Sequence, residues 1–381
     1  MAPAASRRIL LLVSAIVLVD ICFYAAITPL LPTYVDDLGL SKAQAGVLSG
    51  AYAAGTLAAS LPGGWLASRW GARPTLLLGL GLLAAASVAF GAADSFGLLV
   101  VARVAQGVGG AASWAAGLAW LVQVTPPARR GQAIGTALGA AVAGAMGGPV
   151  LGGLAHELSP LAAFGGIALL AVGLSLAVLA TASPGAAPQS GTVRVAFRQG
   201  AVQSAFWLTM LPALFFGVFG VLVPLRLDDL GAGAIAVAAI FLAGAAVEAC
   251  ASPLAGRLSD RRGRARPLKL GLAGVVVACL VLPLPTAVWS AAVVALLATA
   301  AGGLLTAPAM ALLSDTAERT GLAQGLAFGL VNLAWAGGQV TGSLGGASLA
   351  ETTSDTAVYV LMAAVVAATL AWLLTRDISR S

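Results

Sequence analysis

Charge is scarce in this chain. Only 9% of its 381 residues are Asp, Glu, Lys or Arg, whereas soluble domains carry about 25%. At the same time, 60% of the residues are hydrophobic. This balance excludes a soluble enzyme and a disordered chain, and it indicates a membrane protein built almost entirely of spanning helices.

Cysteine and histidine are also rare. The three cysteines lie in apolar runs without metal-ligand spacing, and the single histidine, His156, stands beside Glu157. Common hydrolytic chemistry therefore lacks its parts, and we expect no enzymatic activity, no metal and no cofactor. The basic residues do not gather on a soluble module, so we expect no nucleic-acid partner.

The apolar runs are long enough to cross a bilayer, which takes about 20 residues per helix. Ser41 and Gln44, three apart, predict a capping box at the start of the second run. A polar segment, residues 183–203, separates the sixth run from the seventh. The twelve expected spans are 9–32, 43–68, 74–92, 96–124, 129–156, 160–182, 204–227, 233–259, 267–285, 287–313, 321–350 and 354–375.

The loops between these spans differ in charge. With alternate loops assigned to opposite sides, every basic residue except Arg103, Lys42 and Arg226 falls on one side. Lys and Arg mark the cytoplasmic side of a membrane. We therefore expect an integral protein of the bacterial inner membrane, with both termini and the linker 183–203 in the cytoplasm.

The chain repeats itself. A shift of 192 residues places the Asp-Asp-Leu-Gly of 36–39 on that of 228–231, and a shift of 190 overlays glycines of the fifth and eleventh spans. The sequence thus predicts an all-α membrane protein with two six-helix bundles, 1–182 and 204–381, related by pseudo-two-fold symmetry. Two such bundles suit alternating access around a midplane cavity.

Four local patterns stand at defined spans. Gly-Trp-Leu-Ala-Ser-Arg-Trp-Gly-Ala-Arg occupies 64–73, and a related basic loop occupies 256–266. Arg103, Gln106 and Gly107 lie in the fourth span, and a glycine-rich stretch around Pro149 lies in the fifth. Glycines four apart share a helix face and permit close helix approach, and a proline within a helix can bend it.

Together these patterns resemble the loop and span signatures of the major facilitator superfamily. The nearest resemblance is to its 12-span drug:proton antiporters and vesicular amine transporters, which Asp20 followed by Pro29 and Pro32 also suggests. The resemblance implies a cytoplasmic gate, although Ser68 replaces the aspartate usual in the first loop. The residues expected to act in conformational gating are Gly64, Arg69, Gly71, Arg73, Gly256, Asp260, Arg261, Gly263, Arg264, Gly144, Gly148, Pro149 and Gly152.

Three ionisable residues lie deep in the predicted spans: Asp20, Arg103 and Glu248. A charge at the bilayer midplane costs at least ~2.5–3.5 kcal/mol, so such residues mark functional sites by default. Asp20 and Arg103 are expected at similar depth, either coupled in one cavity or joined as a static ion pair. Asp20 is the first candidate for proton coupling, and Glu248 is the second.

Polar and aromatic side chains recur at helical spacing in three spans, which indicates faces turned away from lipid. These faces contact either substrate or only neighbouring helices. The candidate cavity residues are Tyr24, Thr28, Tyr52, Thr56, Phe328, Asn332, Trp335 and Gln339.

The sequence therefore predicts a secondary active transporter that exports small amphipathic or cationic molecules in exchange for protons. Its expected partners are a small-molecule substrate, protons and the lipid bilayer, and we expect a monomer. The alternatives are a specific carrier for a sugar, amino acid or organic ion, and a non-transporting membrane sensor.

Overall fold

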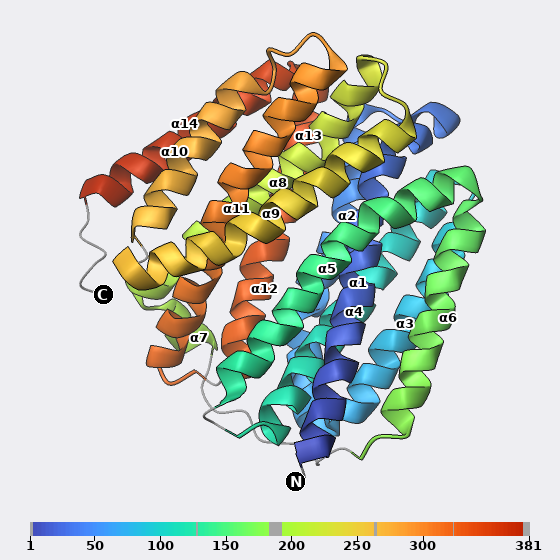
Figure 1. Ribbon diagram of the computed structural model, residues 1–381, viewed down its shortest axis with the longest axis vertical. Coiled ribbons are helices and arrows are strands. Elements are labelled where there is room, and N and C mark those ends of the chain that lie inside the picture. Colours follow the sequence, from blue (N-terminus) through green and yellow to red (C-terminus); the bar gives the residue numbers. More distant parts are fainter. Residues whose placement is uncertain (1–2, 127–128, 183–192, 263–264, 323, 376–381) are drawn as a thin grey trace. The chain divides into compact units, whose positions relative to one another are not determined.

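The computed structural model describes residues 3–126, 129–182, 193–262, 265–322 and 324–375. Helices coincide with all twelve predicted spans (Figure 1). In the first half they are α1 (Pro3–Leu38), α2 (Lys42–Trp70), α3 (Ala72–Gly91), α4 (Phe96–Val124), α5 (Arg130–Glu157) and α6 (Pro160–Leu179). In the second half they are α7 (Val193–Phe197), α8 (Gly200–Asp229), α9 (Ala234–Arg262), α10 (Ala265–Val281), α11 (Val288–Arg319), α12 (Gln324–Val340), η2 (Thr341–Gly345), α13 (Gly346–Thr352) and α14 (Asp355–Thr375).

Two helix ends are built alike, as the repeat predicts. Gly39 and Gly231 both have positive φ angles, 60° and 91°. Just beyond them, the Leu40 amide donates to the Val35 carbonyl at 3.0 Å, and the Ala232 amide donates to the Leu227 carbonyl at 2.9 Å. This six-to-one bond closes a Schellman motif, in which glycine adopts the left-handed conformation at no steric cost. The repeat therefore extends to single hydrogen bonds.

The capping box at the start of α2 is confirmed. The Ser41 amide donates to Gln44 Oε1 at 2.9 Å, and the Gln44 amide donates to Ser41 Oγ at 3.3 Å. The two side chains thereby satisfy amides that the first turn of a helix leaves unpaired.

The eleventh predicted span is not a uniform helix. It consists of α12, a π-helical turn η2, and α13. Gly46 and Gly50 of α2 lie so close to this segment that a Cβ at either glycine would overlap Ser343 or its neighbours. A π turn inside a long helix often marks a functional position.

By length and composition, nine of the helices in the described part of the chain can cross a membrane; α2, α10 and α12 are not among them.

The chain folds into two compact units. The first contains Met1–Leu30, Ala51–Gly191 and Ala323–Leu333, and the second contains Leu31–Gly50, Thr192–Leu322 and Ala334–Ser381. The predicted bundle bounds, 1–182 and 204–381, stay a prediction.

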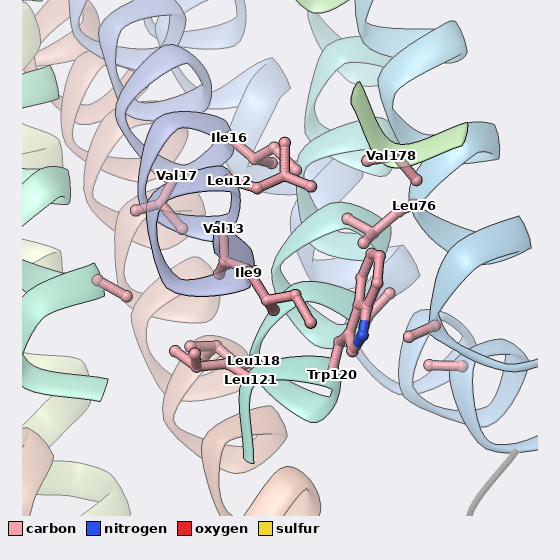
Figure 2. Packing of buried hydrophobic residues seen from close by; sticks show 14 of the residues in the cluster. Ile9, Leu12, Val13, Ile16, Val17, Leu76, Leu118, Trp120, Leu121 and Val178 are labelled. Atoms are coloured by element: carbon pink, nitrogen blue, oxygen red, sulfur yellow. The ribbon is translucent and has the colours of Figure 1, made fainter. Parts of the chain in front are cut away.

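An apolar cluster holds the first unit together. Ile9, Val13 and Ile16 of α1 meet Trp120 of α4 and Leu76 of α3, and all five side chains are at most 1% exposed (Figure 2). Burial of large apolar side chains contributes about 1.5–3 kcal/mol each in water; between membrane helices, close packing takes over this role. The cluster fixes α1 against α4, the two helices that carry Asp20 and Arg103.

Candidate functional site

The carboxylate of Asp20 is the centre of a buried polar site in the first unit. Asp20 is 1% exposed. Its Oδ1 accepts a hydrogen bond from the Tyr52 hydroxyl, and its Oδ2 accepts one from Trp114 Nε1, both at 2.8 Å. These residues come from α1, α2 and α4, so a single carboxylate joins three helices.

Gly110 of α4 makes room for this arrangement. A Cβ at this position would overlap both Asp20 Oδ1 and the Tyr52 hydroxyl oxygen. Only a residue without a side chain allows α4 to lie this close to the Asp20–Tyr52 pair.

Arg103 is fully buried and is bound mainly to α1. Its Nη1 donates to the Phe23 carbonyl at 3.0 Å, and its Nη2 donates to the Tyr24 carbonyl at 3.1 Å. Its guanidinium carbon lies 5.2 Å from the centre of the Tyr52 ring, within the range of a cation–π interaction. Tyr52 therefore contacts both predicted charges, with its hydroxyl on Asp20 and its ring on Arg103.

A polar chain extends this site along α4. Arg103 Nη1 also donates to Gln106 Oε1 at 3.1 Å, and Gln106 Nε2 donates to Ser87 Oγ of α3 at 3.2 Å. On the α2 side, Thr56 Oγ1 donates to the Tyr52 and Gly107 carbonyls at 3.1 and 3.3 Å. These hydrogen bonds between buried polar groups hold the side chains in place.

Sequence reasoning missed Trp114, Gly110 and Ser87. Trp114 lies 94 residues from Asp20, and an isolated tryptophan in an apolar helix carries no pattern. Gln106 had a usable signal, because it stands three residues after Arg103, where helical side chains meet.

The candidate cavity residues divide between the two units. In the first unit, the rings of Tyr24 and Tyr52 lie 5.2 Å apart and Thr28 is half-buried. Phe328 packs against the apolar cluster that contains Trp120. Asn332 also belongs to the first unit, whereas Trp335 and Gln339 belong to the second.

Glu248 belongs to the second unit, whereas Asp20 and Arg103 belong to the first. Glu248 is half-buried on α9. Its Cγ lies 3.1 Å from the position that a Cβ on Gly303 of α11 would occupy. The structure thus joins Asp20 and Arg103 through Tyr52 and places Glu248 in a different environment.

The first basic loop is held by local contacts. Gly71 has a φ of 92° and directly precedes α3. Arg69 lies over the Trp65 ring at 5.5 Å, and Arg73 Nη2 donates to the Leu179 carbonyl of α6. Ser68 Oγ donates to the Trp65 carbonyl at 2.7 Å. A Cβ at Gly64 would meet open space.

The second basic loop falls largely outside the described residues. The side chains of 252–262 and the whole of 263–264 are not among them. The gating predictions for Gly256, Asp260, Arg261, Gly263 and Arg264 therefore stay predictions.

The glycine face of α5 packs against α1. A Cβ on Gly144 would overlap the Leu18 carbonyl, and one on Gly148 would overlap Ala25. A Cβ on Gly152 would overlap the Ala26 carbonyl and Pro29, and Pro149 is buried within the continuous helix α5. These glycines therefore pack α5 closely against α1, and their expected role in gating stays a prediction.

Acidic side chains of the second unit bind the start of α2. Lys42 Nζ forms an ion pair with Asp355 Oδ1 at 2.7 Å. The Ala43 amide donates to Glu351 Oε2 at 2.6 Å, which lowers the pKa of the Glu351 carboxyl. Amides in the first helical turn attract negative charge. We call these four residues the α2 clamp.

Comparison with known proteins identifies the family. A model of the Major Facilitator Superfamily matches residues 13–328 and 205–381. The chain belongs to the major facilitator superfamily. The predicted all-α fold with twelve helices in two six-helix bundles is confirmed.

Superfamily relatives match parts of the chain. The MFS-type transporter ppzB of Metarhizium majus is 33% identical over 165 residues, 41% of this chain and 36% of the relative. The chloramphenicol resistance protein of Streptomyces lividans is 31% identical over 246 residues, 61% of this chain and 62% of the relative. The probable vesicular acetylcholine transporter-B of Danio rerio is 33% identical over 167 residues, 41% of this chain and 34% of the relative. The chain spans about a third of the length of the ppzB transporters that it matches.

Solved superfamily structures share the fold. A bacterial homologue of the human lysosomal transporter Spinster, inward-facing and unoccupied, has a TM-score of 0.74 at 17% identity, covering 98% of this chain and 96% of that one. The human organic anion transporter MFSD10 also has a TM-score of 0.74 at 17% identity, covering 98% and 100%.

Proposed function

We propose that this transporter exports small amphipathic or cationic molecules in exchange for protons, with Asp20 as the proton site. The observation that carries the proposal is the Asp20 carboxylate, buried between three helices with one hydrogen-bond donor on each oxygen. An acidic group at this depth is expensive to maintain and is functional by default.

The two donors on Asp20 respond differently to a proton. An ionised carboxylate accepts from both, as the geometry shows. A protonated one must donate through one oxygen, and the Trp114 indole cannot accept because it is a donor only. Tyr52 can accept, so the proton goes to the oxygen facing Tyr52 and reverses that hydrogen bond.

This reversal gives the proton a structural effect. After it, the Tyr52 hydroxyl hydrogen needs another acceptor, while the Tyr52 ring still lies on Arg103. Arg103 in turn binds the Phe23 and Tyr24 carbonyls of α1. Protonation of Asp20 thereby changes the contacts between α1, α2 and α4, and it biases the equilibrium between two access states.

The charge of the site favours a cationic or neutral substrate. An ionised Asp20 attracts a cation and repels an anion, so proton and cation compete for one state of the carrier. Among the relatives, the chloramphenicol resistance protein and the probable vesicular acetylcholine transporter support a small-molecule substrate by their names. A carrier for organic anions fits this site less well.

Transport into proteoliposomes with an imposed pH gradient tests the proposal. Wild-type protein is expected to accumulate an amphipathic amine against its gradient, and Asp20→Asn is expected to lose this accumulation while retaining substrate exchange without a gradient. Asp94→Asn, at an exposed acid of the same unit, is the matched control and should transport normally. Full gradient-driven accumulation by Asp20→Asn would refute Asp20 as the coupling site.

A further inference from the structure

Glu248 lies on an aromatic-lined face of the second unit. Phe241, Gly244 and Glu248 are spaced by three and four residues, so they share one face of α9. That face is turned toward α11, because a Cβ on Gly244 would lie 3.3 Å from Thr299 Oγ1 and Gly303 lies against the Glu248 side chain.

Two adjacent glycines of α11 make room at this face. A Cβ on Gly303 would crowd the Glu248 methylene at 3.1 Å, and a Cβ on Gly302 would overlap the ring of Phe216 from α8. The carboxylate-bearing side chain and the aromatic ring therefore approach neighbouring positions of one helix. Any larger residue at Gly302 or Gly303 would displace one of them.

Phenylalanine rings continue from this point. The rings of Phe216 and Phe219 lie 6.2 Å apart, and those of Phe219 and Phe241 lie 5.7 Å apart, both edge to face. Phe216 and Phe241 are only half-buried. Aromatic faces attract cations through the quadrupole of the ring.

The Glu248 carboxylate differs from that of Asp20 in its bonding. Both Asp20 oxygens hold a donor. By contrast, none of the side chains described in the second unit donates a hydrogen bond to Glu248 or forms an ion pair with it. Glu248 is only partly exposed, and a carboxylate within a membrane span requires a compensating charge or donor.

We propose that Glu248 and the rings of Phe216, Phe219 and Phe241 form a second binding site, which takes organic cations that carry aromatic or other apolar groups. Glu248 supplies the opposite charge, and the rings supply apolar and cation–π contacts. Gly302 and Gly303 leave room for the Phe216 ring and the Glu248 side chain. The proposal rests on the proposed transport function and separates two roles. Asp20 takes the proton, and Glu248 binds the positive charge of the substrate.

Equilibrium binding of radiolabelled tetraphenylphosphonium to the purified full chain tests this site. Glu248→Gln, which keeps size and removes charge, should weaken binding by about tenfold or more, since an ion pair near a low-dielectric interior exceeds 1.4 kcal/mol. Phe241→Leu should weaken binding about threefold through the lost cation–π contact. The exposed Glu157→Gln, which removes a charge from a surface acid in the same way, should bind as wild type does.

Three outcomes would overturn the site. They are unchanged binding by both Glu248→Gln and Phe241→Leu, an equal loss in Glu157→Gln, and no binding by wild-type protein. Phe241→Leu keeps the test valid if Glu248→Gln misfolds, which size-exclusion chromatography reveals. Proton-driven accumulation of an uncharged amphipathic substrate separately tests the proposed function, so it can succeed while the Glu248 site fails.

Discussion

Tyr52 carries more of the buried network than its single hydroxyl suggests. Its hydroxyl donates to Asp20, and its ring lies against Arg103 and beside Tyr24. Its carbonyl accepts a hydrogen bond from the Thr56 hydroxyl. A residue that contacts a proton acceptor and a fixed cation at once can transmit the charge state of one to the surroundings of the other.

Tyr52→Phe should therefore uncouple transport while preserving the ring contacts. A hydrogen bond to a charged group contributes about 1.5–3 kcal/mol, so we expect proton-driven accumulation to fall about tenfold or more. Initial uptake rates in proteoliposomes under a pH gradient measure this loss. Tyr359→Phe, at a buried tyrosine of α14, is the control, and equal rates for wild type and Tyr52→Phe would contradict the prediction.

At this scale the sequence predicted the charges better than their partners. Asp20 and Arg103 stand out because ionisable residues are rare in apolar runs. Trp114 and Gly110 do not, because tryptophan and glycine are ordinary in such helices and their roles arise only when α4 packs against α1 and α2. The direct partners of Asp20 are Tyr52 and Trp114. These are tertiary contacts, which no local sequence pattern predicts.

Among the helices, the glycine ladders show how far the repeat extends. Gly144 contacts Leu18 of α1, and Gly338 contacts Met210 of α8. The shift of 192 residues pairs Leu18 with Met210. Gly152 and Gly346 likewise contact the paired residues Ala26 and Val218. The overlay at 190 instead pairs Gly148 with Gly338, one helical turn away from the pairing that the contacts give. Sequence alignment found the ladders but not their register, because glycines four apart match equally well after a slip of four.

Gly148→Ala should destabilise the first unit. Its methyl group would overlap Ala25 of α1, and such overpacking costs about 1–3 kcal/mol. The midpoint of thermal unfolding in detergent should fall accordingly. Gly139→Ala in the same helix, where a Cβ meets open space, is the control, and an equal effect in both variants would mean that helix propensity, not packing, decides.

The α2 clamp should open in acid. The hydrogen bond from the Ala43 amide, and to a smaller extent the one from the Ser41 side chain, lowers the pKa of the Glu351 carboxyl below its ordinary 4.5. A carboxyl with a lowered pKa stabilises the contact at any pH above its ordinary pKa. This contribution is lost as the pH falls through the lowered pKa. Hydrogen exchange at Ala43, corrected for intrinsic rates, should therefore accelerate below pH 4.5.

Glu351→Gln serves as the reference for this experiment. Without the ionised carboxylate, Ala43 should exchange faster than in the wild type above pH 4.5 and show no added acid step. A wild-type profile that runs parallel to the Glu351→Gln profile would argue against the clamp.

For the whole molecule, the sequence predicted the fold class correctly because the apolar runs, the internal repeat and the charge alternation agree on twelve spans. The α2, α10 and α12 helices fall short of an 18-residue apolar criterion, and the repeat and the charge alternation support them. The orientation of the chain rests on charge alone.

Cysteine labelling can test that orientation. In a variant lacking Cys22, Cys250 and Cys279, Asp37→Cys and Ser190→Cys should react with an impermeant maleimide from opposite faces, Ser190→Cys from the cytoplasm. The physical reason is the retention of basic loops on the cytoplasmic side. Labelling of both positions from one face would refute the twelve-span topology.

Because of the π-helical turn η2, the number of residues in the eleventh span determines which side chains face α2. Such a turn contains one residue more than an α-helical turn, so it rotates everything beyond Gly345 by about 100° relative to a helix of constant pitch. The offset sets which side chains face α2, among them Ala347 at Gly46 and Glu351 at Ala43. A single-residue deletion between 341 and 345 would leave the hydropathy of the span unchanged and yet turn these side chains away from α2. An insertion or deletion here therefore rotates the rest of the helix about its axis, and we expect it to be more damaging than most substitutions at the same positions.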